Sequence, residues 1–226
     1  MIDGVCFIPC APALVPEIGR GLDAELGDVR AALASVVRPR EIIHQSIAGI
    51  GNPAHRLALI GPGATSAAYG PGDRGSFAGF GVDLEVALQG SGGTAVMPPA
   101  LAVGTYFART AVRAWAIGAN GGTPDIDEDG PTTLVVLGDG SARRTEKAPG
   151  YFDERAAGYD EAVRAALASG DPTQLAALDA GLGAELLASG APVWRAVAPL
   201  LTRTFRADVR YAGDPFGVEY LVALWE

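Results

Sequence analysis

Thr132-Thr133-Leu134-Val135-Val136-Leu137 is the stretch of sequence that decides the fold. It is rich in β-branched residues, and Pro131 and Gly138 bound it on either side. A run of this composition between two such residues predicts a β-strand with sharp ends. The segments before and after it indicate the kind of sheet to which this strand belongs.

Strand-like and helix-like segments alternate along the rest of the chain. Short apolar runs predict further strands at 4–8, 57–60, 82–88, 93–97, 206–211 and 218–225. Apolar residues at helical spacing predict helices at 16–38, 99–116, 153–168, 172–188 and 191–203, and Pro39 is expected to end the first of them. The alternation predicts an α/β fold, a three-layer α/β/α arrangement with a mostly parallel mixed central sheet.

Length and composition indicate one globular domain spanning residues 1–226. Hydrophobic residues make up 49% of the chain and charged residues 19%, a balance typical of folded proteins. The net charge of -9 argues against a nucleic-acid partner, because neutralising phosphates requires clustered Lys and Arg. We find neither a signal-peptide pattern nor an apolar run of membrane-spanning length, so no membrane partner is expected and we expect a cytoplasmic protein. Its two cysteines, Cys6 and Cys10, lie four positions apart around the end of one predicted strand. This is poor geometry for a disulfide, so both are expected to be free thiols.

Ligands of open α/β sheets bind beyond the carboxyl ends of the strands. Three predicted loops leave strands in this way, at 9–16, 61–80 and 138–151. We therefore expect the functional residues in these loops.

Several short motifs have two interpretations each. Asp125–Gly130 matches the first half of an EF-hand loop, but the twelfth position would be Val136 instead of Glu, which favours a solvated acidic turn. Gly61-Pro62-Gly63 lacks the Gly-Lys-Ser/Thr of a phosphate loop and favours a tight turn. Cys10 is either a buried structural thiol or a nucleophile activated by the helix that follows it.

Three segments, in order, resemble the class III extradiol ring-cleavage dioxygenases, the family of protocatechuate 4,5-dioxygenase β subunits and Memo-type proteins. They are Phe7–Glu17, Ile60–Gly63 and Val135–Arg143, and Lys147–Asp153 with the helix after it is similar to an actinobacterial branch. The resemblance implies a histidine at three positions, two of them metal ligands and one an acid-base catalyst. Cys10, Gly63 and Ala142 stand there instead, whereas Asp139, Ser141 and Arg143 match the family pattern. Cys10, Gly63 and Ala142 would all face one cleft.

The family's Fe(II) cofactor is implied by the resemblance but not supported by the residues present. A non-haem iron site needs two imidazoles and a carboxylate, and ring cleavage needs a further base. The chain has only His44 and His55, both in the ambiguous segment 40–56 and outside the resembling motifs. Glu219 is either the leftover carboxylate of that site or an exposed strand residue. We therefore expect no metal cofactor.

The resemblance and the missing histidines together give three functional hypotheses. The first is a family member that has lost ring cleavage and keeps a cleft for a small aromatic or acidic ligand, held by Arg143, Arg144 and the loop backbone. A second is an enzyme with altered, metal-independent chemistry that uses Cys10 and Asp139. A third is a scaffold or partner-binding protein, in the form of a homodimer.

Overall fold

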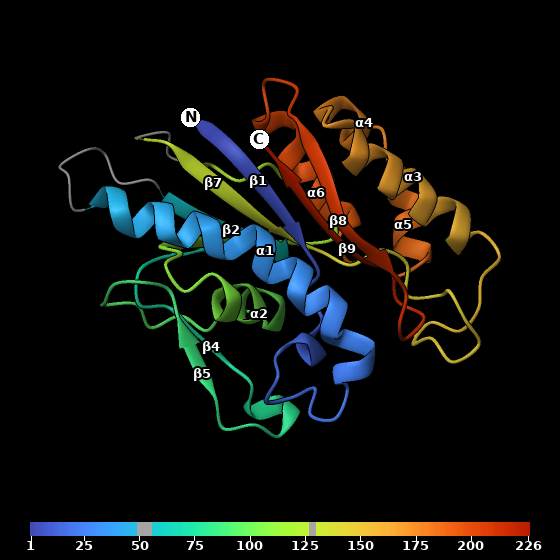
Figure 1. Cartoon of the computed structure of the whole chain (residues 1–226), viewed down its shortest axis with the longest axis horizontal. Coiled ribbons are helices and arrows are strands. Elements are labelled where there is room, and N and C mark those ends of the chain that lie inside the picture. Colours follow the sequence, from blue (N-terminus) through green and yellow to red (C-terminus); the bar gives the residue numbers. More distant parts are fainter. Residues whose placement is uncertain (49–55, 127–129) are drawn as a thin grey trace.

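A seven-stranded sheet forms the centre of the protein, in a computed structural model that describes residues 1–48, 56–126 and 130–226 (Figure 1). Its strands, in spatial order, are β3 (Ala67–Tyr69), β6 (Arg113–Ile117), β2 (Arg56–Pro62), β7 (Thr132–Leu137), β1 (Ile2–Ile8), β9 (Tyr220–Trp225) and β8 (Ala207–Gly213). β6, β2, β7 and β1 run parallel, while β3 and β9 run against their neighbours. The predicted α/β fold with a mostly parallel mixed sheet is confirmed.

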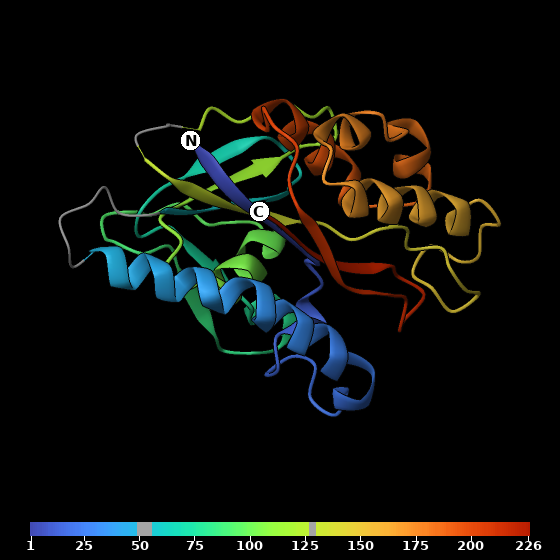
Figure 2. The same ribbon diagram turned by 45° about the horizontal axis from the view of Figure 1, so that its top comes forward.

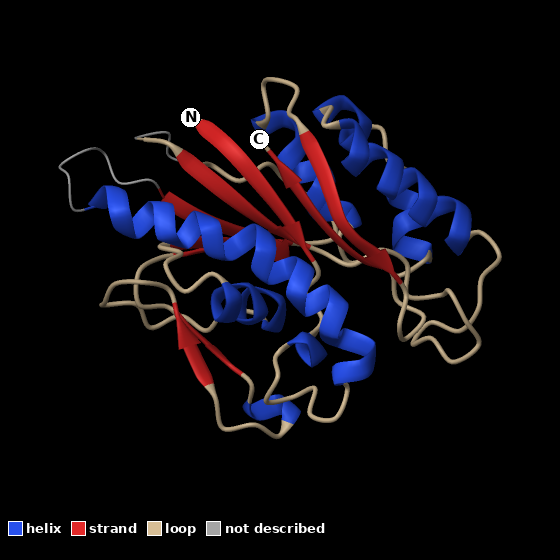
Figure 3. Ribbon diagram, in the orientation of Figure 1, coloured by secondary structure: helices blue, strands red, loops and turns tan. Residues whose placement is uncertain are grey.

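Helices cover both faces of this sheet (Figures 2 and 3). One face carries α1 (Asp23–Ala48) and α2 (Pro99–Phe107). The other carries α3 (Ala156–Ser169), α4 (Pro172–Ala176), α5 (Ala180–Glu185) and α6 (Ala191–Val197). Short 3-10 turns lie at Pro12–Leu14, Ala78–Phe80 and Ala198–Leu200, and a separate hairpin consists of β4 (Arg74–Ser76) and β5 (Glu85–Ala87).

Two buried cores, one on each face, hold the three layers together. Successive side chains of a strand point to opposite faces, so β1 places Val5 and Phe7 in the core under α3–α6. Cys6 and Ile8 of the same strand lie in the core under α1 and α2. The strand β7 divides Leu134–Leu137 between the two cores in the same way, so both central strands carry apolar residues on both faces; their polar residues, Asp3, Thr132 and Thr133, lie near the beginnings of the strands.

The first helix differs from its expected bounds at both ends. It begins at Asp23 rather than near residue 16, because residues 16–21 form turns and Gly21 has a positive φ of 79°. It also continues through Pro39 to Ala48, so the expected end before Pro39 is wrong. A proline inside a helix removes one backbone donor and crowds the preceding turn, but the helical backbone continues past Pro39 here. This helix covers part of the ambiguous segment 40–56, and residues 49–55 lie outside the described residues.

The predicted helix 99–116 is the largest error of the sequence analysis. The helix α2 ends at Phe107, and Arg113–Ile117 forms β6 inside the sheet. Ala114 and Ala116 have a high helix propensity but are buried here between β2 and β3, so tertiary packing decides their conformation.

Other expected boundaries are wrong on a smaller scale. The expected loop 61–80 contains β3 and β4, and of the expected strand 93–97 only Val96 makes an isolated bridge, with Arg74. The expected helix 172–188 is two short helices, α4 and α5, and each begins at an aspartate cap, Asp171 or Asp179.

None of the helices in the described part of the chain is long and apolar enough to cross a membrane.

Candidate functional site

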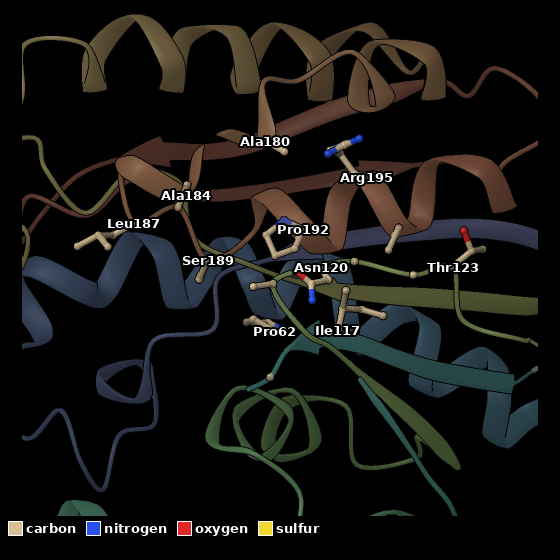
Figure 4. A pocket seen from close by; sticks show the side chains of 16 residues that line it. Pro62, Ile117, Asn120, Thr123, Ala180, Ala184, Leu187, Ser189, Pro192 and Arg195 are labelled. Atoms are coloured by element: carbon tan, nitrogen blue, oxygen red, sulfur yellow. The ribbon is translucent and has the colours of Figure 1, made fainter. Parts of the chain in front are cut away.

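A cavity of about 500 Å³ opens at the edge of the sheet where β2 and β6 end (Figure 4). Clefts of this size at the carboxyl ends of parallel strands commonly bind small molecules. Its described lining residues come from four segments: the end of β2, the loop after β6, α5 with the turn that follows, and α6. They are Pro62, Gly63, Ile117, Ala119, Asn120, Gly121, Gly122, Thr123, Ala180, Ala184, Leu187, Ala188, Ser189, Pro192, Arg195 and Ala196.

The helix α6 supplies one wall because its residues repeat with the helical period. Pro192, Arg195 and Ala196 lie three and four positions apart and so share one face. Figure 4 shows Arg195 on one side of Pro192, with Ser189 and Leu187 on the other. The cavity therefore has a cationic end and an end lined by Leu187, Ala184 and Ser189.

Arg195 is the only charged residue among the described residues that line the cavity. Within the described part of the chain it forms no ion pair with a carboxylate. A guanidinium has donors in a fixed planar fork that matches a carboxylate or phosphate. Arg195 is exposed, and its N–H donors have no hydrogen-bond partner among the described residues, so they can bind an anionic ligand.

The loop after β6 closes the cavity opposite α6, and Ser66 fixes its shape. The backbone N–H of Gly118 donates to Ser66 Oγ at 3.1 Å, and Ser66 Oγ donates to the carbonyl of Gly121 at 3.3 Å. Gly121 and Gly122 have φ values of 71° and 122°, which side chains rarely allow. Glycine at both positions lets the backbone itself form the cavity wall.

Cys10, Asp139 and Ser189 form a hydrogen-bonded cluster at the Ser189 end of the cavity. The Cys10 N–H donates to Asp139 Oδ1 at 2.9 Å, and its thiol donates to Oδ2 at 3.4 Å. The Asp139 N–H donates to Ser189 Oγ at 2.9 Å, and that oxygen lies 3.5 Å from Cys10 Sγ. Ser189 alone of the three lines the cavity, so it links the cluster to any ligand.

The environment of this cluster raises the pKa of the Cys10 thiol and of the Asp139 carboxyl group. Burial, followed by the charge of Asp139, raises the pKa of the Cys10 thiol well above its ordinary value. Burial also raises the pKa of Asp139 to about 6, although hydrogen bonds from Cys10 act in the opposite direction. A nucleophilic cysteine needs a lowered pKa, so Cys10 has the electrostatics of a structural thiol.

The residues at this edge do not fit the Fe(II) site that the resemblance implies. Cys10 and Asp139 are hydrogen-bonded to each other, and the side chain of Ala142 has no atom that could ligate a metal. A Cβ built on Gly63 would lie 2.7 Å from the Cβ of Ala116, so this backbone has no room for a side chain there. Gly63 does line the cavity, but Cys10 and Ala142 do not, and the three do not share one cleft.

Ser141 and Arg144 belong to a second polar cluster, built around Asp160 of α3. Ser141 donates to Asp160 through its N–H at 2.8 Å and through its hydroxyl. Arg144 Nε lies 3.8 Å from Asp160 Oδ2 and donates to Asp214 Oδ2 at 2.9 Å. This cluster joins the loop after β7 to α3, and its Arg144 already has two carboxylate partners.

Glu219 is not the exposed strand residue that one of the two interpretations expected. It precedes β9, its side chain is fully buried, and Arg164 of α3 donates to its Oε1 at 2.7 Å. A buried carboxylate is stabilised by a charged partner of this kind, so the pair fixes α3 against the sheet. Glu219 Oε2 has no hydrogen-bond partner among the described residues.

Of the seven candidate residues from the sequence, Gly63 lines the cavity, and Cys10 and Asp139 reach it through Ser189. Ser141, Arg144 and Glu219 instead join the loops to α3. Arg143 is half-buried and does not line the cavity.

Comparisons with known proteins leave the family open. No model of a known protein family matches this chain. No curated protein has a sequence similar to it.

The sequence did not predict Ser189, Leu187, Arg195 or the loop at 118–123 as parts of the site. The loop follows β6, and a strand at 113–117 would have marked it as a fourth strand-end loop. Its Gly121-Gly122 pair was the available signal. No local pattern distinguishes Ser189, in the turn before α6, or Arg195, in α6, from its neighbours in the sequence.

Proposed function

We propose that this protein binds a small aromatic or acidic molecule in the cavity at the ends of β2 and β6. In this proposal it is a class III extradiol dioxygenase-like protein that has lost the Fe(II) site and ring cleavage. The carrying observation is Arg195, which has no ion-pair partner among the described residues and lies in a cavity whose other described lining residues are uncharged. The ligand's anionic group binds Arg195, and its apolar part packs on Pro62, Ile117 and Pro192.

In the proposed site the cation that binds the ligand is Arg195, and not Arg143 or Arg144 as expected from the sequence. Arg144 is held by Asp160 and Asp214, and a ligand would have to break those contacts to bind it. Arg195 needs no such rearrangement, because its guanidinium already lies at the cavity.

Binding of an anionic aromatic probe tests this proposal. We expect 1-anilinonaphthalene-8-sulfonate to bind the folded protein, measured by its fluorescence, and benzoate to compete with it. Arg195→Gln should weaken the probe about tenfold, because a charge-assisted hydrogen bond is lost. Arg113→Gln is the matched control: Arg113 is also exposed but lies at the opposite end of β6, and its substitution should leave affinity unchanged. Equal affinities in all three proteins would contradict the proposal.

Metal analysis tests the loss of ring cleavage separately. Protein purified without chelators should contain far less than one iron per chain and take up no oxygen with catechols. Near-stoichiometric iron together with oxygen uptake on a catechol would overturn this part of the proposal.

A further inference from the structure

Leu187 occupies a backbone position that normally belongs to glycine. The helix α5 ends in a Schellman motif, in which the N–H of Ala188 donates to the carbonyl of Gly183 at 2.8 Å. The N–H of Leu187 donates to the carbonyl of Ala184 at 3.2 Å, and Leu187 has a φ of 58°. The residue at this point of the motif is left-handed and usually glycine. In the same chain, α3 ends on Gly170 with a φ of 67°.

Packing in the core does not explain a leucine at this position. Leu187 is 49% exposed, and its Cδ1 lies against Gly150 in the loop after β7, so its side chain is only partly buried and is not part of either core. A left-handed conformation costs free energy for every residue that has a Cβ. Residues held in such conformations cluster at ligand-binding sites, where the surrounding structure maintains them.

The side chain of Leu187 lines the cavity at the end away from Arg195. Figure 4 shows it beside Ala184, with Ser189 and Pro192 between it and Arg195. This end of the wall is largely apolar. A small inorganic anion would contact Arg195 and leave Leu187 uncovered.

We infer that Leu187 is a specificity-determining residue, held in a strained conformation so that its side chain contacts the apolar end of the ligand. This inference rests on the proposed function and narrows it. The ligand is an amphiphilic organic anion: its acidic group binds Arg195, and a ring or alkyl group at its other end packs on Leu187.

Tyr151 provides a matched control within the same chain. It is the other non-glycine residue with positive φ among the described residues, at 61°, and it is 61% exposed. It does not line the cavity. Asparagine tolerates the left-handed region better than leucine or tyrosine, so the same substitution relieves strain at both sites.

The experiment compares stability and probe affinity in Leu187→Asn, Leu187→Met and Tyr151→Asn. Both asparagine variants should unfold at a higher urea concentration than the wild-type protein. Leu187→Asn should bind 1-anilinonaphthalene-8-sulfonate about five- to tenfold more weakly, because an apolar contact is lost. Leu187→Met keeps an apolar side chain and should bind within about twofold of wild type, and Tyr151→Asn should bind as wild type.

The outcomes separate this inference from the proposed function. A wild-type protein that does not bind the probe would refute the proposed function itself. Probe binding that depends on Arg195 but is the same in wild type and Leu187→Asn would refute the inference alone. A Leu187→Asn protein less stable than wild type would also refute it, because leucine would then be the favoured residue for folding.

Discussion

At the scale of single residues, Asp139 makes stability depend on pH. Its folded-state pKa of about 6 lies above its ordinary value of 3.8, so the folded protein binds this proton more tightly than the unfolded chain. The resulting stabilisation is complete below about pH 4 and is lost as the pH rises through 6. Asp139→Asn keeps an acceptor for the Cys10 N–H and should stabilise the protein at pH 7.5 by about 2 to 3 kcal/mol. Urea unfolding of both proteins from pH 4 to 8 measures this difference.

Only the difference between the two unfolding curves reports on Asp139. Other carboxyl groups also titrate in this range, and the pKa of Asp160 is likewise raised by burial. A difference that stays constant from pH 4 to 8 would show that Asp139 has an ordinary pKa. The identity of this aspartate was predictable from the sequence, but its pKa was not, because burial and the Cys10 contact arise from a residue 129 positions away.

At the scale of elements, the sequence predicted the strands β1, β2, β7, β8 and β9 better than the other strands and the helix ends. The strand 132–137 was predicted to the residue, because two structure-breaking residues bound a β-rich run. The strand 113–117 was missed, because its alanines carry a helical signal that only its neighbours in the sheet override. That error also hid the loop after β6 and with it one wall of the cavity. Arg195 was not predicted for another reason: that it lines the cavity and has no ion-pair partner in the described part of the chain can be seen only in three dimensions.

The short helix α5 should couple stability to ligand binding through its cap. Asp179 accepts a hydrogen bond from the N–H of Leu182, and Ala180 and Ala184 of this helix line the cavity. Asp179→Ala should cost about 1 kcal/mol of stability and weaken probe binding several-fold, because the cavity wall frays. Asp171→Ala removes the corresponding cap of α4, which does not line the cavity. It should lose similar stability with unchanged probe affinity, and equal losses of affinity in both variants would contradict the role of α5.

At the scale of the whole molecule, the shared central strands should make the chain unfold as one unit. All three tryptophans, Trp115, Trp194 and Trp225, lie in the core under α3–α6. Cys6 lies in the core under α1, where its thiol donates to the carbonyl of Val36 at 3.3 Å. Because β1 and β7 supply residues to both cores, neither core can open while the other stays intact. In a Cys10→Ser protein, tryptophan fluorescence and Cys6 thiol reactivity should therefore follow the same urea transition, and Cys6 reacting at lower urea would show two independent units.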